Sequence, residues 1–388
     1  MDFSIDAQTQ LLLETVTRFV QERLQPLEDA VEQSGELAPD IARDIFVQAR
    51  ELGLYGMNIP TEFGGGGLST VQMCLVEERL GHTKDILIRR AFGNVYEVLL
   101  ACTGAQIERW LLPAVAGDRV CSIAITEPGA GSDAASVRTK ASRDGSGWRL
   151  TGHKHFISDA DFSDFFVVLA QTDDPGLQGR PSLFLVDKGL EGFTVGRDQP
   201  MMGLAGTKHL ELHFDSVPID AQCLLGEQGR GMRLVLETLG RIRLAHIGAR
   251  AVGMADRILA LMLEQARSRE QFGQAIGQFQ FMQQMLADSA LELTSARLMI
   301  QHAAWRIDQG LAARENIAMV KVHAAETLGR IADRAVQMFG GSGYAKEGPV
   351  ERFYRDSRIF RIYDGTSEIH RGAIAHGMIK HGTSFIEF

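Results

Sequence analysis

The chain has 388 residues, of which 45% are hydrophobic and 23% charged, and its formal net charge at pH 7 is −9. This balance is typical of a soluble globular protein with two or three domains, and the acidic charge argues against nucleic acid as the main partner, because phosphate-binding surfaces are basic. No apolar run approaches the roughly 20 residues that a membrane span requires, and the acidic first residues lack the basic region of a signal peptide, so we expect a cytoplasmic protein without membrane insertion.

The cysteines are too scattered to suggest a disulfide framework or a metal site. They show neither CxxC spacing nor an accompanying histidine cluster, and they stand at Cys74, Cys102, Cys121 and Cys223. Such a pattern favours reduced thiols. We therefore expect no bound metal.

Residues 1–120 have the pattern of helices. Apolar residues recur at helical spacing over 11–20, and Asp6 is a plausible N-cap for this first helix. The segment 63–67, a phenylalanine followed by four glycines, predicts a turn rather than a phosphate-binding loop, because no Lys-Ser/Thr follows it.

Residues 121–228 have the pattern of short strands. Residues 210–215 alternate apolar and polar side chains, and 165–170 and 183–186 are short apolar runs bounded by turn residues. Two further strands, 148–151 and 154–158, are expected on either side of a turn at Gly152.

Residues 229–388 are predicted to be helical again. The segment 232–269 holds no proline and predicts one or two long helices, with further helices over 278–309 and 315–338. Long amphipathic helices with short links suggest a four-helix bundle. The predicted fold is therefore a multi-domain α+β chain: an N-terminal α-helical domain, 1–120, a central β-barrel-like domain, 121–228, and a C-terminal four-helix bundle, 229–388.

Two segments far apart in the chain carry the chemistry. One reads Ile-Thr-Glu-Pro-Gly-Ala-Gly-Ser-Asp over 125–133, and the other reads Ile-Tyr-Asp-Gly-Thr-Ser-Glu-Ile over 362–369. Alone, each suggests a tight turn. Together they resemble the flavin-contacting loop and the catalytic-base loop of the acyl-CoA dehydrogenase family. The helical–β–helical order extends this resemblance over essentially the whole chain.

The resemblance implies that Asp364 is the catalytic base, which removes the α-proton of a bound thioester. The family more often has Glu there, and Asp shortens the arm by roughly 1.3–1.5 Å. Some family branches carry the base on a C-terminal helix, at a position that corresponds to Ile242. Neither Ile242 nor its neighbours Arg241 and Arg243 is acidic, so Asp364 has no obvious rival.

By resemblance, FAD is the cofactor, and its ring lies against the strand from Ile123 to Thr126. Thr126 bonds the polar edge of the ring, and Ser132 contacts the CoA portion of the substrate. Phe156 covers one face and Ser158 donates to the reactive nitrogen, where the family usually has Trp and Thr. On its own, Phe156 would more often be a core residue. The remaining expected contacts of this region are Ile125 and Ile157.

The adenine end of FAD is expected to meet residues from the C-terminal part of the chain. Singly, each of these residues has an ordinary alternative as an exposed helix residue or a helix C-cap. Some of them are reached from a neighbouring subunit in the family, which implies a homo-oligomer, a tetramer or alternatively a dimer. The residues are Arg269, Gln271, Phe272, Gln280, Gln337, Gly340 and Gly341. Gly365, Thr366 and Glu368 follow the base and are expected to touch FAD as well.

Several arginines are candidates for contacts with the substrate. Arg243, or Arg241 if the register shifts, is a candidate for the CoA phosphate or for the base of that pocket, since its fork geometry matches phosphate. A solvated helix charge is the alternative. By resemblance to the family, residues around 86–102 help form the acyl pocket. If one of Arg89 and Arg90 points inward there, near Asn94, the acyl tail would be short and polar or acidic.

The sequence thus predicts an FAD-dependent acyl-CoA dehydrogenase that passes electrons to an acceptor such as an electron-transfer flavoprotein. One alternative keeps the fold and changes the reaction: a flavin oxidase or monooxygenase similar to nitroalkane oxidase, which uses Asp as its base, or an enoyl-CoA reductase. A second alternative is a helical binding protein that has lost its cofactor.

Overall fold

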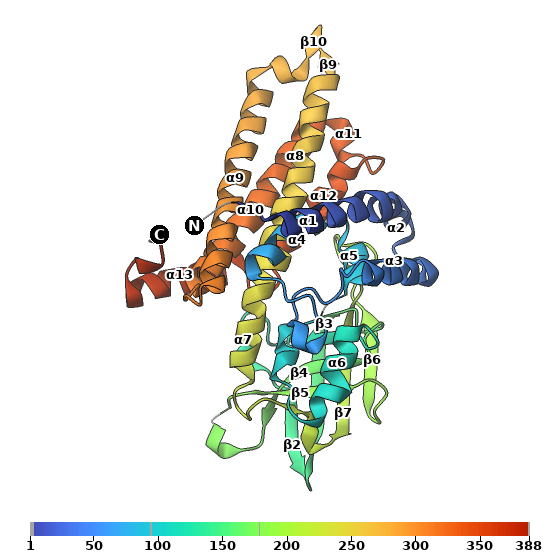
Figure 1. The fold of residues 1–388 in the computed structure, drawn as a ribbon, viewed down its shortest axis with the longest axis vertical. Helices are drawn as coiled ribbons and strands as arrows, with labels where there is room; N and C mark the ends of the chain where they lie inside the picture. Colours follow the sequence, from blue (N-terminus) through green and yellow to red (C-terminus); the bar gives the residue numbers. More distant parts are fainter. Residues whose placement is uncertain (1–3, 94, 178, 387–388) are drawn as a thin grey trace.

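The computed structural model describes residues 4–93, 95–177 and 179–386. Its longest axis runs from a sheet at one end to the tip of long helices at the other (Figure 1). Most of the N-terminal helices lie beside the middle of this axis, whereas the last of them lies against the sheet. The chain therefore passes from helices to strands and back to helices, as the sequence predicts.

The N-terminal region is built from short helices, most of which surround one apolar cluster. Asp6 caps the first helix through a 2.9 Å bond from the Thr9 amide to its Oδ1, as predicted. The glycine run is a tight turn, because a Cβ at Gly65 would lie 2.2 Å from the Ile59 carbonyl oxygen. The helices are α1 (Ala7–Phe19), α2 (Glu28–Ser34), α3 (Pro39–Glu51), α4 (Thr70–Leu80), α5 (Asp85–Phe92) and α6 (Leu112–Ala116).

The central region is a mixed eight-stranded sheet. Its strands follow the order β6-β7-β3-β2-β4-β5-β8, with β1 paired to β4 in parallel. Among the described residues these pairings leave β6 and β8 at the ends, so hydrogen bonds do not close the barrel-like sheet. The strands are β1 (Cys121–Ala124), β2 (Lys140–Asp144), β3 (Gly147–Ser158), β4 (Phe165–Thr172), β5 (Ser182–Asp187), β6 (Phe193–Asp198), β7 (His209–Ile219) and β8 (Leu224–Leu225).

Gly152 corrects one prediction. The sequence suggested a turn there, but β3 runs through it without a break. A Cβ at Gly152 would lie 2.4–2.7 Å from atoms of Thr139. The glycine therefore serves close approach of a neighbouring segment rather than a reversal of the chain.

The C-terminal region is helical, and α8, α9 and α10 pack along one another (Figure 1). A π-helical stretch, Arg243–Ala249, joins α7 to α8 without a break, and α12 and α13 pack on α10. The helices are α7 (Gly231–Ile242), α8 (Arg250–Ser268), α9 (Gln280–Asp308), α10 (Arg314–Phe339), α11 (Gly341–Tyr344), α12 (Pro349–Ser357) and α13 (Ser367–His381).

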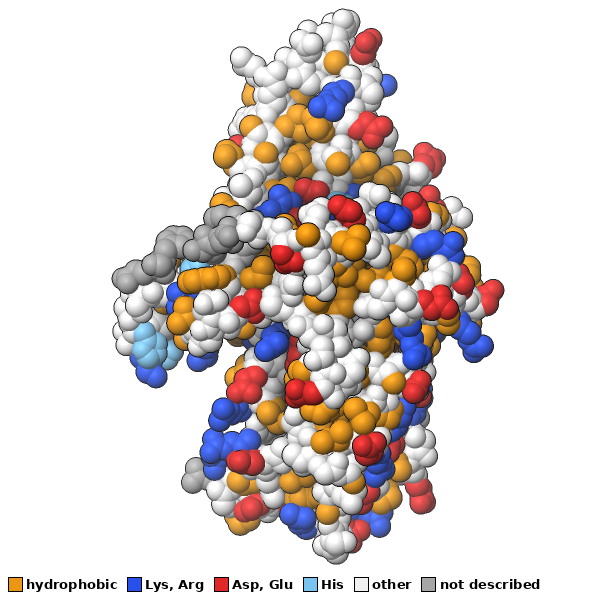
Figure 2. Space-filling view, viewed as in Figure 1, with side chains coloured by type: hydrophobic (Ala, Val, Ile, Leu, Met, Phe, Trp, Pro, Cys, Tyr) orange, Lys and Arg blue, Asp and Glu red, His pale blue; other side chains and the backbone are white. Residues whose placement is uncertain are grey.

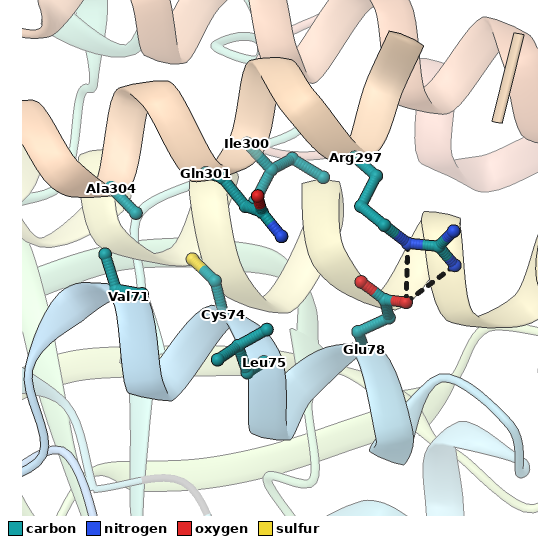
Figure 3. A pocket seen from close by; sticks show the side chains of 8 residues that line it. All are labelled: Val71, Cys74, Leu75, Glu78, Arg297, Ile300, Gln301 and Ala304. Carbon is teal, nitrogen blue, oxygen red and sulfur yellow. Dashed lines mark hydrogen bonds and ion pairs between the residues drawn. The ribbon is translucent and has the colours of Figure 1, made fainter. Parts of the chain in front are cut away.

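Helix α4 joins the two helical regions by packing on α8 and α9. Figure 3 shows the contact with α9, where Arg297 donates to Glu78 at 2.9 Å beside apolar side chains. The cavity between these helices holds about 10 Å³, which is room for one water at most. This interface is close-packed and offers no space for a substrate.

The prediction of reduced thiols is confirmed, because all four cysteines are free and buried. Within the described residues, none of the helices is both long and apolar enough to cross a membrane.

Candidate active site

Asp364 lies on a strained turn between Arg361 and α13. Its φ of +52° is left-handed, and the φ of Gly365 is +97°. Aspartate tolerates this conformation better than most residues, and such strain is typical of functional sites. At the next position a Cβ would lie 2.8 Å from His370 Nε2, so only glycine fits at 365.

The turn is anchored through its main chain. Arg243 Nε donates to the Asp364 carbonyl oxygen at 2.7 Å, and His370 Nε2 lies 3.2 Å from the same oxygen. Thr366 caps α13 by accepting from the Ile369 amide at 3.3 Å. Within the described part of the chain, the Asp364 carboxylate itself receives no hydrogen bond. The carboxylate is therefore positioned but left available.

The surroundings of Asp364 make it a better base than an exposed aspartate. Burial raises the pKa of its carboxyl above the ordinary value of 3.8, while the charges of Arg243, Lys321 and His246 oppose that rise. A carboxylate with a raised pKa holds a proton more tightly. The nearby positive charges limit this rise, because they favour the ionised form of the carboxylate.

Lys321, on α10, is a site residue that the sequence reading missed. Its side chain is fully buried, and among the described residues its Nζ has no hydrogen-bond partner. Burial lowers its pKa from 10.5 to about 8, and Asp364 partly offsets this. The available signal was a lysine among apolar residues, between Val320 and Ala324 on the buried face of α10.

The glycine-rich loop after β1 is held by a buried ion pair. Glu127 accepts from the amides of Arg138 at 2.6 Å and Thr139 at 2.9 Å, and from Lys154 Nζ at 2.8 Å. Lys154 also donates to the Ile125 carbonyl at 2.9 Å. These bonds fix the loop against β3.

The outer edge of this loop is open. A Cβ added at Gly129 or Gly131 would meet nothing within 4 Å, and Ser132 is exposed. Thr126 is half-buried, and its carbonyl accepts from the His155 amide at 2.8 Å. Ile123 and Ile125 are also partly exposed. An exposed, glycine-lined edge is what the approach of a flat ring requires, so these residues fit FAD.

The end of β3 holds the other predicted ring contacts. Phe156 has a φ of +59° at a bulge and is 46% exposed, which departs from ordinary core packing. Ile157 is 2% exposed in the sheet core. Its side chain therefore cannot contact a cofactor, and the expectation for Ile157 is limited to its backbone.

Ser158 has a partner that the sequence reading missed. Its Oγ lies 3.0 Å from Nδ1 of His209, on the paired strand β7. Burial lowers the pKa of His209, so its ring is neutral. If Nδ1 carries the proton and donates, the Ser158 hydroxyl hydrogen stays free for an acceptor on a ligand.

Some of the residues expected to contact FAD from the C-terminal region lie on a hairpin far from the sheet. Phe272 and Gly273 form a two-residue turn between β9 (Glu270–Gln271) and β10 (Gln274–Ala275), with φ of +53° and +78°. This hairpin is at the far tip of the long helices from the sheet (Figure 1). Phe272 is 95% exposed. The other predicted contacts with exposed side chains or backbone are Arg269, Gln271, Gln280, Gln337, Gly340, Gly341 and Glu368.

The arginines proposed for an acidic acyl tail are paired with carboxylates of this chain. Arg89 donates to Asp85 at 2.5 Å and to Asp159 at 3.1 Å, and Arg90 donates to Asp159 at 2.9 Å. Asn94 lies outside the described residues. Arg241 is exposed, whereas Arg243 holds the Asp364 turn. The pairing removes the basis for an acidic tail at Arg90 and Arg89.

A small polar cavity of about 20 Å³ lies between α4, α5 and the π-helical stretch. Glu77 lines it and pairs with Arg250, and His246 Nε2 lies 3.3 Å from Glu77 Oε1. Three residues of the predicted 86–102 segment, Phe92, Gly93 and Val95, also border it. These polar groups show that the region behind the site is not purely apolar.

Three family models match the chain in succession. They are the acyl-CoA dehydrogenase N-terminal domain over residues 6–118, the middle domain over 122–217 and the C-terminal domain over 229–379. An acryloyl-CoA reductase (NADH) from Anaerotignum propionicum is 33% identical, with 98% of this chain and 96% of the relative covered.

Solved structures agree. Butyryl-CoA dehydrogenase from Megasphaera elsdenii is similar with a TM-score of 0.89 and 29% identity, over 98% of this chain and all of that one. A structure of PigA with FAD and proline is similar with a TM-score of 0.90 and 28% identity, over 97% of this chain and 99% of that one.

Proposed function

The chain belongs to the acyl-CoA dehydrogenase family, and we propose that it dehydrogenates an acyl-CoA thioester between its α- and β-carbons, with Asp364 as the base. It is an FAD-dependent oxidoreductase. The observation that carries the proposal is the half-buried Asp364 carboxylate on a strained turn, with a raised pKa and no hydrogen bond from the described residues.

The Asp364 carboxylate takes the α-proton and becomes a carboxylic acid, and the electrons of that C–H bond form the new double bond. FAD, when bound, supplies the acceptor for the hydride that leaves the β-carbon. Partial burial of the turn limits water around the reacting carbon, which strengthens electrostatic interactions there. The positive charges of Arg243 and Lys321 favour the ionised form of this carboxylate.

The residues proposed to hold the flavin ring are those of the open edge: Ile123, Ile125, Thr126, Ser132, Phe156 and Ser158, with the backbone of Ile157. Gly365, Thr366 and Glu368 follow the base and are proposed as further contacts. Ser132, Arg241 and Arg243 are proposed for the CoA portion. Arg243 already bonds the Asp364 carbonyl through Nε, so its terminal nitrogens would serve this second role.

The adenine end is proposed to be completed by a second copy of the chain. The support is the distance of the β9–β10 hairpin from the base turn (Figure 1) and the exposure of Phe272. Nearby on α9, Phe281 is 77% and Leu291 68% exposed, and Figure 2 shows hydrophobic side chains on this face of the long helices. Covering this surface would stabilise a homo-oligomer, a tetramer or a dimer.

A second candidate function is the reverse reaction, reduction of an enoyl-CoA. The observation that favours it is the similarity to the acryloyl-CoA reductase. The same carboxyl group would then return a proton to the α-carbon. An oxidase or monooxygenase reaction is the other alternative, because Asp is also the base of nitroalkane oxidases.

The test is to mix the FAD-loaded protein with a panel of saturated acyl-CoAs without oxygen and to record the flavin absorbance. We expect rapid bleaching with at least one thioester and reoxidation by an electron-transfer flavoprotein. No bleaching with any thioester, together with rapid oxidation of the reduced protein by O2 and peroxide release, would instead favour the oxidase. Protein that cannot take up FAD would support a binding role.

A further inference from the structure

A histidine–carboxylate cluster lies on the outward side of β3 and β7, next to Phe156. His153 and His155 alternate along β3, and Glu211 and His213 alternate along β7. Because side chains two residues apart point to the same face of a strand, each pair shares one face. The register places His153 directly opposite His213, so four metal-ligating side chains form one patch.

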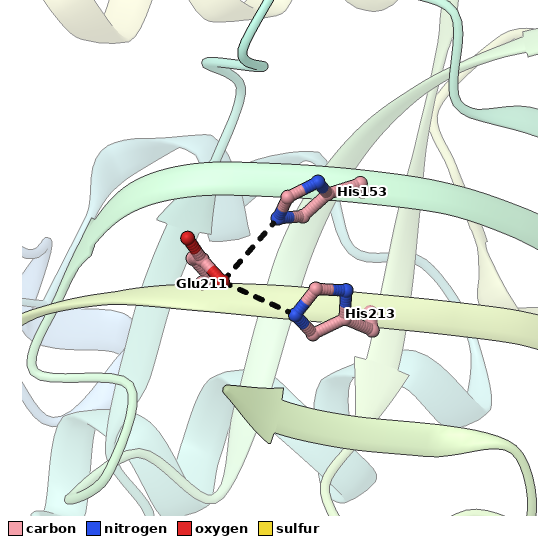
Figure 4. A group of neighbouring side chains, drawn as sticks. All are labelled: His153, Glu211 and His213. Carbon is pink, nitrogen blue, oxygen red and sulfur yellow. Dashed lines mark ion pairs between the residues drawn. The ribbon is translucent and has the colours of Figure 1, made fainter. Parts of the chain in front are cut away.

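We propose that this patch binds one divalent transition-metal ion through His153, Glu211 and His213, with His155 as the fourth ligand. Figure 4 shows the first three side chains pointing toward one another from β3 and β7. The proposal is independent of the dehydrogenation reaction.

The distances suit a site that closes on the ion. Nε2 of His213 lies 3.3 Å from Glu211 Oε2, and Nε2 of His153 lies 3.9 Å from the same oxygen. The ligand atoms of all three lie within 4.8 Å of one another. Ligands of a tetrahedral zinc ion, with bonds of about 2.0–2.1 Å, are separated by about 3.4 Å. Small side-chain rotations therefore bring the three atoms to ligating distance.

The imidazole nitrogens lack other partners. Nε2 of His153 and Nε2 of His155 are shielded from solvent, and among the described residues neither has a hydrogen-bond partner. His155 Nε2 lies 3.9 Å from Glu211 Oε1. Buried polar atoms without a partner are uncommon and call for an explanation. An ion between the rings and the carboxylate provides one for both nitrogens.

Two residues on the neighbouring strand β6 support the metal ligands. A Cβ at Gly196 would lie 2.7 Å from His213 Nε2 and 3.1 Å from Glu211 Cβ, so glycine leaves the room that the imidazole occupies. Arg197 Nε donates to Glu211 Oε1 at 3.0 Å. This bond orients the carboxylate and leaves Oε2 toward His153 and His213, as residues around metal ligands commonly do.

The ligand set indicates the kind of ion. Imidazole nitrogens with one carboxylate suit Zn²⁺, Co²⁺ or Ni²⁺, whereas Ca²⁺ and Mg²⁺ prefer oxygen ligands only. The sequence reading expected no metal because it looked for clusters in the linear sequence. The signal was His-x-His on one strand and Glu-x-His on another, which only the strand pairing brings together.

A metal bound at this site would restrict the conformation of β3 near its C-terminal end. The His155 ring stacks on Phe156 with centroids 4.0 Å apart, and the β3–β7 register shifts directly after Lys154. A metal would join the two strands at this irregular point. It would thereby restrain Phe156, which is proposed to cover the flavin.

The test is calorimetric titration of the FAD-loaded protein with Zn²⁺, after dialysis against a chelator, and titration with Co²⁺ followed by visible absorption. We expect one saturable site per chain and the intense bands of four-coordinate cobalt. His213→Gln and Glu211→Gln should each weaken binding at least tenfold, since even residues around the ligands contribute about 10–100-fold. Gly196→Ala, which removes no ligand, should weaken binding by displacing the His213 ring.

The matched control is His376→Gln, which removes an exposed histidine on α13 and should leave binding unchanged. Absence of a saturable site overturns the proposal. Binding that is as tight in His213→Gln and Glu211→Gln as in the parent protein overturns it as well. FAD content and circular dichroism of each variant establish that the protein remains folded.

Discussion

The glycine-rich loop after β1 and the turn before α13 each have a carboxylate with a lysine nearby, but the two regions differ in how these groups are hydrogen-bonded. In the first, Glu127 accepts three hydrogen bonds, and Lys154 donates to both Glu127 and the Ile125 carbonyl. In the second, the Asp364 carboxylate receives no hydrogen bond from the described residues, and Lys321 Nζ is buried without a hydrogen-bond partner among them.

The pKa directions follow this difference. Hydrogen bonds outweigh burial at Glu127 and lower its pKa, whereas burial dominates at Asp364 and raises its pKa. Charged groups with all their hydrogen bonds made hold a structure rigid, whereas charged groups with strongly shifted pKa values and few hydrogen bonds are typical of reactive sites. The comparison predicts that substitutions in the first loop affect stability most, whereas substitutions in the second affect chemistry.

The largest effect on stability is expected from Glu127→Gln. It leaves the fully buried Lys154 without its carboxylate partner, and breaking a buried pair in this way costs about 3–5 kcal/mol. Urea denaturation followed by circular dichroism measures the change in the free energy of unfolding.

The matched control for Glu127 is Glu227→Gln, because the Glu227 side chain is 83% exposed and lies 3.8 Å from Arg230. We expect a change within about 0.5 kcal/mol there. Equal effects of the two substitutions would remove the distinction between the loops.

The next largest effect is an increase in stability rather than a loss. Lys321→Met removes a charge that burial disfavours, and the lowering of its pKa from 10.5 to about 8 corresponds to as much as about 3 kcal/mol of stabilisation at pH 7. The exposed Lys380→Met is the control. A destabilised Lys321→Met protein would contradict the proposed unsatisfied charge.

The pH dependence follows from the same pKa. Between about pH 8 and 10.5 the unfolded chain holds the Lys321 proton more tightly than the folded one, so the parent protein gains stability as the pH rises. The difference between parent and Lys321→Met should therefore close over this range. The substitution also removes a charge that lowers the pKa of Asp364, so the acid limb of kcat/KM should move to higher pH.

The smallest effect is expected at Thr366. Thr366→Ala removes the cap of α13, and Asp6→Ala removes the cap of α1; each costs about 1 kcal/mol of stability. Only Thr366→Ala should also weaken FAD binding, by about fivefold for a lost bond of about 1 kcal/mol. Fluorescence titration with FAD distinguishes the two variants. Equal FAD affinities of Thr366→Ala and Asp6→Ala would show that Thr366 does not contact FAD.

The sequence predicted the order of the regions and most of the elements, because apolar periodicity and caps are local signals. Helices 278–309 and 315–338 appear as α9 and α10 with bounds shifted by at most two residues. Gly152 was misread as a turn, because its conformation is set by Thr139 on a neighbouring segment. Contacts of that kind are absent from a local pattern.

The site was only partly predictable for the same reason. Asp364 could be named from its motif, but Lys321 and His209 carry no motif, and only packing brings them to Asp364 and Ser158. Ile157 shared a motif with Phe156 and Ser158, yet the alternation along β3 turns its side chain into the core. Motifs locate a loop, whereas the fold decides which of its side chains face a ligand.

The central claim is that Asp364 is the base, and the rate of anaerobic flavin reduction in Asp364→Asn tests it most directly. Asparagine tolerates the same left-handed backbone, so FAD binding and stability should remain as in the parent protein. With the preferred acyl-CoA we expect the rate to fall by about 10²–10⁴-fold. Flavin reduction within a few-fold of the parent rate would show that another group removes the proton.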